Sequence, residues 1–198
     1  AKIYTGTWQQ SVGHFYDSFY PWEAFLSNAA VQKKLDNYHL LKGNMILTFY
    51  VNGTPFHVGM LMASYQYLNN DNTKFVTGGD SQIITFSQRP HLKLNVATNK
   101  SGCLCIPFYY PHNYLSLNNN TLSAQDIGRV FIISFKDLFQ INGGTDDVTI
   151  TVYAQMQDVK LTGPTVQNVA LSGSGSLSGL FDLQAQSKLE KKDEYEET

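Results

Sequence analysis

Apolar and polar residues alternate along much of this chain with a period of two, which is typical of β-strands that bury one face. In residues 43–51 one face carries Met45, Leu47, Phe49 and Val51, and the polar positions Asn44, Thr48 and Asn52 fall on the other. Residues 146–161 alternate over their whole length, and the side chains predicted to point inward are Val148, Ile150, Val152, Ala154 and Met156. The sequence Asn-Gly-Gly at 142–144 predicts the turn before that strand.

A strand over residues 57–65 differs because both of its faces are apolar or small. It follows Asn52-Gly53, a pair suited to a tight turn with positive φ. Along the strand, Val58, Met60 and Met62 alternate with Gly59, Leu61 and Ala63. Such a strand is normally covered on both sides. We therefore expect Met60 to lie on a buried face, although the surrounding sequence predicts few helices.

The remaining patterns predict further short strands. Residues 82–96 indicate two strands interrupted at Arg89-Pro90, the second with Leu92, Leu94 and Val96 opposite His91, Lys93 and Asn95. Residues 102–110 indicate another strand, in which Pro107 predicts a bulge or a sheet edge. Residues 128–135 are continuously apolar, residues 23–38 have short helical or turn character, and residues 1–20 are aromatic-rich and irregular. About eight strands with few helices predict an all-β fold, and eight antiparallel strands favour a jelly-roll β-sandwich.

Composition and charge limit the classes of function. Charged residues make up 15% of the 198 residues, against about 25% in a typical domain, which favours a surface covered by partners. The net charge is −2, and outside residues 188–198 the chain carries 11 basic and 11 acidic residues. This neutral chain lacks the basic field of a strong nucleic-acid binder. No apolar run is long enough to span a membrane.

Candidate chemistry along the chain is weak. The loop Gly173–Gly179 lacks the Lys-Ser/Thr of a phosphate-binding loop and is better explained as a linker. Cys103 and Cys105 are two residues apart in a strand, a poor geometry for a disulfide, so we expect reduced thiols. The histidines have no metal-ligand spacing; they are His14, His39, His57, His91 and His112.

Four further interpretations stay open at this point. His39 and His57 could meet across neighbouring strands and bind a metal, although a histidine held by the backbone or at an interface is the simpler explanation. Cys103, Cys105 and His112 give only half of a zinc site. Asp146-Asp147 offers paired carboxylates but is more simply a solvated turn. The aromatic residues before Tyr20 could stack on bases or pack in the sandwich, and packing is favoured because lysine and arginine are not interleaved among them.

The order of four sequence blocks resembles the capsid jelly roll of picorna-like viruses. The blocks are PWEAFLSNAAVQKKLDNYHLLKGNMILTFYVNGTPFHVGMLMASYQYL, SQRPHLKLNVATNKSGCLCIPFYYPHNYLSL, GRVFIISFKDLF and DDVTITVYAQMQDVKLTGPT. The resemblance covers residues 21–165 and is strongest to capsid proteins of dicistroviruses, iflaviruses and marine algal RNA viruses. The ending SKLEKKDEY is similar to the region that follows the jelly roll in one of their large subunits.

The resemblance implies a division of the chain into three parts. Residues 1–20 would be an extended N-terminal segment, residues 21–165 the jelly roll, and residues 166–198 a Ser/Gly-rich extended tail. Two four-stranded sheets with strand orders B-I-D-G and C-H-E-F would face each other. The strand ending at Asn52 would be strand B, the next strand would be C, residues 148–161 would be strand I, and strand G is not placed. The second face of strand 57–65 would meet a neighbouring subunit or the inner layer of a shell.

The implied function is a non-enzymatic structural subunit. It would assemble with two related jelly-roll chains and their symmetry copies into a pseudo-T=3 icosahedral shell around a positive-strand RNA genome, in the host cytoplasm and then in the virion. Weak contact with the RNA and binding to a host receptor stay open. No catalytic, cofactor-binding or metal-binding residue is predicted, and binding residues are unknown. An Asp-Asp-Phe maturation motif of some relatives is not carried over, because Asp146-Asp147 is followed by Val148.

Two other functions can use a jelly roll. A carbohydrate-binding, lectin-like protein is the main alternative, and the Asn- and Asp-rich loop at 68–72 could form a sugar or calcium site. A cupin-like enzyme would need a His/Glu metal cluster on inner strands, which the sequence does not indicate. Sequons at Asn52, Asn99 and Asn119 are interpreted as chance occurrences.

Overall fold

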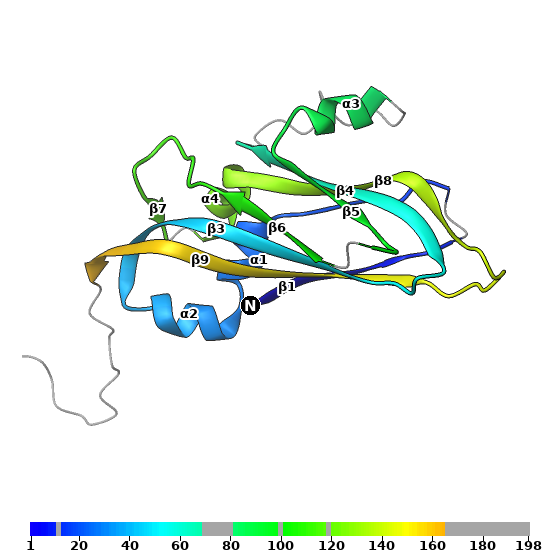
Figure 1. Cartoon of the computed structure of the whole chain (residues 1–198). Helices are drawn as coiled ribbons and strands as arrows, with labels where there is room; N and C mark the ends of the chain where they lie inside the picture. The colour runs from blue at the N-terminus through cyan, green and yellow to red at the C-terminus, as the bar shows by residue number, and fades with distance from the viewer. Residues whose placement is uncertain (11–12, 69–80, 99–100, 118–119, 165–198) are drawn as a thin grey trace, which may run out of the picture. The chain divides into compact units, whose positions relative to one another are not determined.

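The computed structural model describes residues 1–10, 13–68, 81–98, 101–117 and 120–164 (Figure 1). The strands in these ranges are β1 (Lys2–Trp8), β2 (Tyr16–Phe19), β3 (Tyr38–Asn52), β4 (His57–Tyr67), β5 (His91–Asn95), β6 (Ser101–Ile106), β7 (Leu115–Ser116), β8 (Gly128–Gln140) and β9 (Val148–Pro164). The helices are α1 (Pro21–Leu26), α2 (Ala29–Leu35), α3 (Ser81–Ser87) and α4 (Asn120–Ile127).

The strands form two antiparallel sheets that face each other. One sheet has the order β1-β9-β3-β6, with β7 also paired to β3, and the other has the order β2-β8-β4-β5. Lettered along the chain without the two-residue β7, these orders are B-I-D-G and C-H-E-F. The predicted jelly-roll β-sandwich is therefore confirmed. We refer to the two sheets as the BIDG sheet and the CHEF sheet.

The strand letters expected from the sequence are wrong for the first strands. The hairpin at Asn52 joins strands D and E rather than B and C, because β1 and β2 come before it. Two parts of the segment expected to be irregular are strands: β1 pairs with β9 and β2 pairs with β8. Both are terminal strands with one neighbour each, so their apolar alternation is weak. Strand G is β6, the assignment of strand I to β9 is correct, and the jelly roll begins before Pro21.

A second correction concerns residues 81–87, which were expected to form a strand but form helix α3. Its apolar residues follow helical spacing, since Ile83 and Phe86 face the CHEF sheet while Ile84 is 67% exposed. A short apolar run does not distinguish a strand from a helical turn. The second predicted strand is confirmed as β5. Pro107 follows the last residue of β6, an edge strand, as its chemistry requires.

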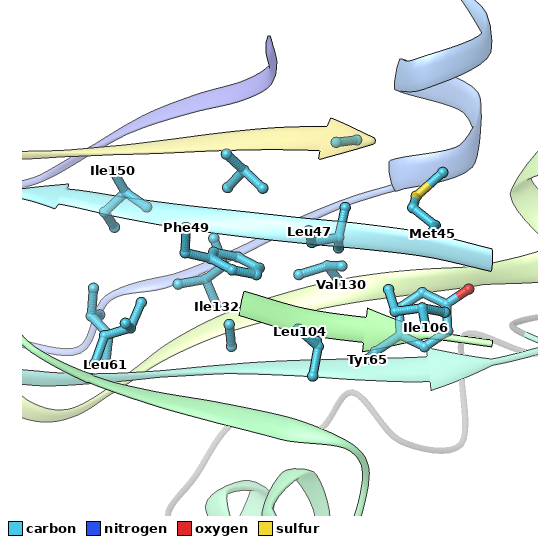
Figure 2. Packing of buried hydrophobic residues seen from close by; sticks show 14 of the residues in the cluster. Met45, Leu47, Phe49, Leu61, Tyr65, Leu104, Ile106, Val130, Ile132 and Ile150 are labelled. Carbon is cyan, nitrogen blue, oxygen red and sulfur yellow. The ribbon is translucent and has the colours of Figure 1, made fainter. Parts of the chain in front are cut away.

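The predicted inward faces of β3 and β9 form the core between the sheets (Figure 2). From the BIDG sheet the core receives Met45, Leu47, Phe49, Val51, Val148, Ile150, Val152 and Ala154, with Met156 partly buried. From the CHEF sheet it receives Leu61, Ala63, Tyr65, Val130 and Ile132. Each large apolar side chain buried in this way contributes about 1.5–3 kcal/mol of transfer free energy. This packing fixes the register of both sheets.

Glycine is needed at the β3–β4 connection for space rather than for backbone freedom. Neither Asn52 nor Gly53 has positive φ, so the expected turn chemistry is wrong there. A Cβ on Gly53 would lie 2.2 Å from Cγ1 of Val96. At the β8–β9 turn, by contrast, Gly143 has φ of 73°, in agreement with the turn predicted at 142–144.

Candidate functional site

His57 lies at the start of β4 and holds two loops at one end of the sandwich. Its side chain is 1% exposed, and its Nδ1 lies 3.0 Å from the backbone N and 2.7 Å from the Oγ1 of Thr54. Because the Thr54 N–H can only donate, Nδ1 accepts, and the proton on Nε2 is donated to the carbonyl oxygen of Asp146 at 3.0 Å. His57 therefore connects the β3–β4 loop to the β8–β9 loop as a structural residue.

The Asp146-Asp147 pair belongs to the same loop cluster. The carbonyl oxygen of Asp146 also accepts a hydrogen bond from Nε2 of Gln10 at 2.9 Å. The Asp146 carboxylate contacts Nε2 of Gln140 at 3.5 Å, and Asp147 is exposed. These contacts fix a turn, as the simpler interpretation of the pair predicted.

The structure does not bring together the proposed histidine metal ligands. His39 lies near the start of β3, whose fifteen residues separate it from the hairpin next to His57. At about 3.3 Å per residue this places them some 40 Å apart along the strand, so the interpretation of His39 and His57 as a metal pair is wrong. Nδ1 of His91 forms a hydrogen bond with the carbonyl oxygen of Arg89. His14 lies near the carboxylate of Asp137. In the described ranges no three His, Cys, Asp or Glu side chains are placed to hold a metal ion.

Cys103 and Cys105 are free thiols on the exposed side of β6. They share a face, as the spacing predicted, and point away from the core that contains Leu104 and Ile106. The Sγ of Cys103 lies 3.7 Å from Oγ1 of Thr48. The glycine loop 173–179, residues 69–72 of the Asn- and Asp-rich loop, and the sequons at 99 and 119 lie outside the described residues.

Four of the N-terminal aromatic residues pack in or against the core of the sandwich. Trp8 and Phe15 are buried in the core with ring centroids 6.1 Å apart, and Tyr4 stacks on Phe19 at 4.5 Å. The Tyr4 hydroxyl donates to the Asp17 carboxylate, and burial together with that carboxylate raises the pKa of Tyr4 above its usual value. The packing interpretation is confirmed for these four residues, whereas Tyr16 is 42% exposed.

The outer face of the CHEF sheet is the largest feature that the sequence did not predict. α3 lies on this face, away from the BIDG sheet (Figure 1), and its Phe86 covers Met62, Phe131 and Ile133. Closer to the β3–β4 and β8–β9 loops this face is no longer covered by α3, and Met60 is 37% exposed. The expectation that Met60 is buried is therefore wrong for this chain by itself. The second face of β4 is thus covered over Met62 by a helix of the same chain, whereas Met60 is left partly exposed by the described residues.

A groove of about 340 Å³ occupies the uncovered part of this face. Its lining is mostly apolar and comes from the start of β4, the end of β5 and the middle of β8: His57, Val58, Gly59, Met60, Asn95, Ala97, Phe135 and Lys136. Lys93 lies beside it, with its Nζ 5.6 Å from the Phe135 ring centroid. Phe139 and Ile141, exposed at the end of β8, extend the apolar surface toward the loops.

Charge is not spread evenly over the chain. Four of the cations gather on the outer face of the CHEF sheet, at Arg89, Lys93, Arg129 and Lys136. Arg89 and Arg129 both lie over the Phe131 ring, at 6.0 and 5.3 Å. Sequence reasoning missed this surface, because the neutral total of the chain does not show where the cations lie. The period-two pattern of β5 and β8 carried a signal for it, since Lys93 and Arg129 occupy outward positions.

None of the helices in the described ranges has both the length and the apolar composition that crossing a membrane requires. The described molecule is a two-sheet antiparallel sandwich with a core between the sheets and exposed apolar residues on its outside. The strand orders B-I-D-G and C-H-E-F define it as a viral-type jelly roll.

Comparison with known proteins agrees with that class. A family model described as picornavirus capsid protein matches residues 2–132, beginning at β1, so the chain belongs to the picornavirus capsid protein family. The structural polyprotein of cricket paralysis virus is 28% identical over 179 residues, which is 87% of this chain and 19% of the polyprotein. The chain thus spans about a fifth of that curated relative.

Solved structures give the same fold. A chain in the structure of a marine algae virus of the order Picornavirales is 32% identical, with a TM-score of 0.75 over 84% of this chain and 72% of that one. A chain of black queen cell virus, 24% identical, has a TM-score of 0.70 over 83% of this chain and 70% of that one, and shows the likeness of fold. The chain is therefore a structural capsid protein of the picorna-like type.

Proposed function

We propose that this chain is one jelly-roll subunit of an icosahedral, pseudo-T=3 shell around a positive-strand RNA genome. The observation that carries the proposal is the pair of strand orders B-I-D-G and C-H-E-F within a chain whose family match begins at Lys2. Two related jelly-roll chains and the symmetry copies of all three are the proposed partners. The role is structural rather than enzymatic, with assembly in the host cytoplasm.

Exposed apolar residues on the described surface support the proposal that the chain assembles with other subunits. Eleven large apolar side chains are more than a third exposed, and those at one end of β4 and β8 are close neighbours: Phe56, Met60, Phe139 and Ile141. The backbone N–H of Ile141 donates to the carbonyl oxygen of Phe56, which holds the two loops side by side. Grouped apolar residues of this kind mark protein interfaces. Closed symmetry then multiplies modest contacts into a stable particle.

Other parts of the proposed function rest on the resemblance alone. The tail at 166–198 is proposed to be an extended segment outside the jelly roll. Weak RNA contact and a host receptor are proposed without assigned residues. The lectin-like alternative has no observation in its favour among the described residues, and its suggested loop lies mostly outside them.

The particle size of native material tests the proposal. Particles purified from infected tissue should sediment as one large species, appear icosahedral in electron micrographs, and contain this chain with two other chains of similar size. The RNA content of the same fraction should resist nuclease until the particle is opened. A chain found only as a monomer or small oligomer would contradict the proposal, and glycan-array binding would then be measured.

A further inference from the structure

Part of the outer face of the CHEF sheet is covered by the chain itself, and part is left exposed by the described residues. Over Met62, Phe86 of α3 provides an apolar cover that removes the side chain from solvent. The same stripe continues to Met60 and Val58, where the groove of about 340 Å³ opens. The exposed part is also mostly apolar, and an exposed apolar groove of this kind is typical of a surface that another molecule covers.

The rim of this groove is basic. Met60 pairs with Lys136 on β8 and with Asn95 on β5, so Lys136 and Asn95 flank it on either side. Lys93 is two residues from Asn95 along β5, opposite Met62. With strands about 4.8 Å apart, the two lysines lie on opposite sides of β4, roughly 10 Å apart across the sheet.

Neither lysine is neutralised within the described chain. No carboxylate of a described residue lies within 4.0 Å of the ammonium group of Lys93 or Lys136. Asp137, next in sequence to Lys136, approaches His14 at 3.8 Å instead. A ligand that fills the groove therefore meets an apolar floor between two positive charges.

We propose that this groove receives an extended acidic peptide segment of a neighbouring capsid chain. An apolar or aromatic side chain of that segment lies over Met60, and carboxylates on either side of it pair with Lys93 and Lys136. The inference deepens the proposed function, on which its choice of partner rests. A peptide fits better than an RNA backbone because Val58, Met60 and Ala97 offer apolar contact rather than hydrogen-bonding groups.

The bound segment buries Met60, as α3 buries Met62. Burial of the exposed part of Met60 supplies apolar transfer free energy, and the lysines select against uncharged or basic segments. Charge pairs at the rim mainly set specificity and association rate, so the contact should weaken as salt rises.

Cross-linking in particles tests the proposal directly. A carbodiimide reagent, which joins an amine to a carboxylate without a spacer, should link Lys93 or Lys136 to an Asp or Glu of another capsid chain. Peptide mapping by mass spectrometry identifies the pair. Intact particles in which both lysines remain unlinked, while other Lys–carboxylate pairs are linked, would overturn the inference and leave the proposed function standing.

A binding measurement on the full chain separates the groove from net charge. The probe is a fluorescein-labelled hexapeptide Asp-Glu-Tyr-Glu-Glu-Thr, and binding is followed by anisotropy. The variant K93Q/K136Q should bind at least tenfold more weakly than wild type. K33Q/K34Q, which loses the same charge from exposed positions on α2, should bind within about twofold of wild type. Both variants should keep the circular dichroism of wild type, since all four lysines are exposed or half-exposed.

Three results would overturn the proposal. The first is equal loss of affinity in the two double variants, which shows attraction by net charge alone. The second is equal binding of the amide probe Asn-Gln-Tyr-Gln-Gln-Thr. The third is displacement of the acidic probe by a uridine 15-mer that itself binds more tightly, which would assign the groove to RNA. Peptide binding by a chain that forms no particles would support the groove and contradict the proposed function.

Discussion

Met60 and Met62 point to the same side of β4, yet Met62 is 0% exposed beneath α3 and Met60 is 37% exposed. Two residues of identical chemistry on one strand face thus differ in whether the chain covers them itself. The difference separates what the isolated chain needs in order to fold from what is available for assembly.

Aspartate at these two positions should affect different properties, namely folding stability at Met62 and particle formation at Met60. Met62→Asp places an unpaired charge against Phe86 and Phe131 and should lower the free energy of unfolding by about 4 kcal/mol or more. Met60→Asp should leave the chain folded, with a loss below about 1.5 kcal/mol, and should reduce the yield of particles. Urea unfolding followed by circular dichroism measures the first effect, and electron microscopy of co-expressed capsid chains measures the second. Severe destabilisation by Met60→Asp would contradict the observed exposure.

Gly59 and Trp8 make a second pair that can be tested. A Cβ on Gly59 would lie 2.6 Å from Cη2 of the Trp8 indole, a rigid ring held in the core. Gly59→Ala should therefore destabilise the chain by about 1–3 kcal/mol through overpacking. Gly13→Ala is the matched control, because a Cβ there meets nothing within 4 Å. The urea midpoints of the two variants should differ, and equal midpoints would show that Trp8 relaxes freely.

Removing the His57 side chain should loosen two loops together. His57→Ala leaves the Thr54 N–H and one acceptor bond of the Asp146 carbonyl without their partner, at a cost of about 2–4 kcal/mol in unfolding free energy. Hydrogen exchange should increase in both the 53–56 and 141–147 loops. His14→Gln, at an exposed position, should change neither quantity. Faster exchange in only one loop would show that His57 does not connect them.

Because Tyr65 is buried, we expect the chain to lose stability at high pH. Its hydroxyl accepts from Nε1 of Trp22 at 3.1 Å and donates to the Ile127 carbonyl, and burial raises the pKa of Tyr65 above its usual value. Because the pKa is higher in the folded state, its contribution is complete below the unfolded pKa of about 10 and is lost as pH rises above it. The unfolding free energy should fall above pH 10 by up to about 1.4 kcal/mol per pH unit from this group.

The control for this prediction is Tyr65→Phe, measured over the same pH range. This variant should be less stable than wild type near pH 8, since Trp22 loses an acceptor, but its slope above pH 10 should be shallower. An unchanged slope would assign the alkaline loss to other groups, including Tyr4, whose pKa is also raised.

The sequence predicted long central strands well and short edge strands poorly. β3 has core on one side along most of its length and β9 has it from Val148 to Ala154, so Leu47 and Ile150 sit in a clear period-two pattern. β1 and β2 lie at sheet edges, where a single neighbour imposes less alternation, and their aromatic residues suggested an irregular segment. The misassigned letters B and C followed from that one omission.

Helix α3 could not be predicted from the sequence for a different reason. Ile83, Ile84 and Phe86 give the same local apolar density in a strand as in a helical turn, and only contact with Phe131 and Met62 decides between them. The groove beside α3 could not be predicted either. It depends on which residues of β4, β5 and β8 meet, and strand pairing is a long-range property.

The sequence by itself determined the all-β class, the inward faces of the two longest strands, and the family resemblance, because alternation and block order are local properties that survive without coordinates. The tertiary structure alone decided the strand letters, the buried role of His57 and the separate fates of Met60 and Met62. It also decided where the charge lies. Lys93 and Lys136 are 43 residues apart in a neutral chain, and only the pairing of β5 and β8 with β4 brings them to the same apolar groove.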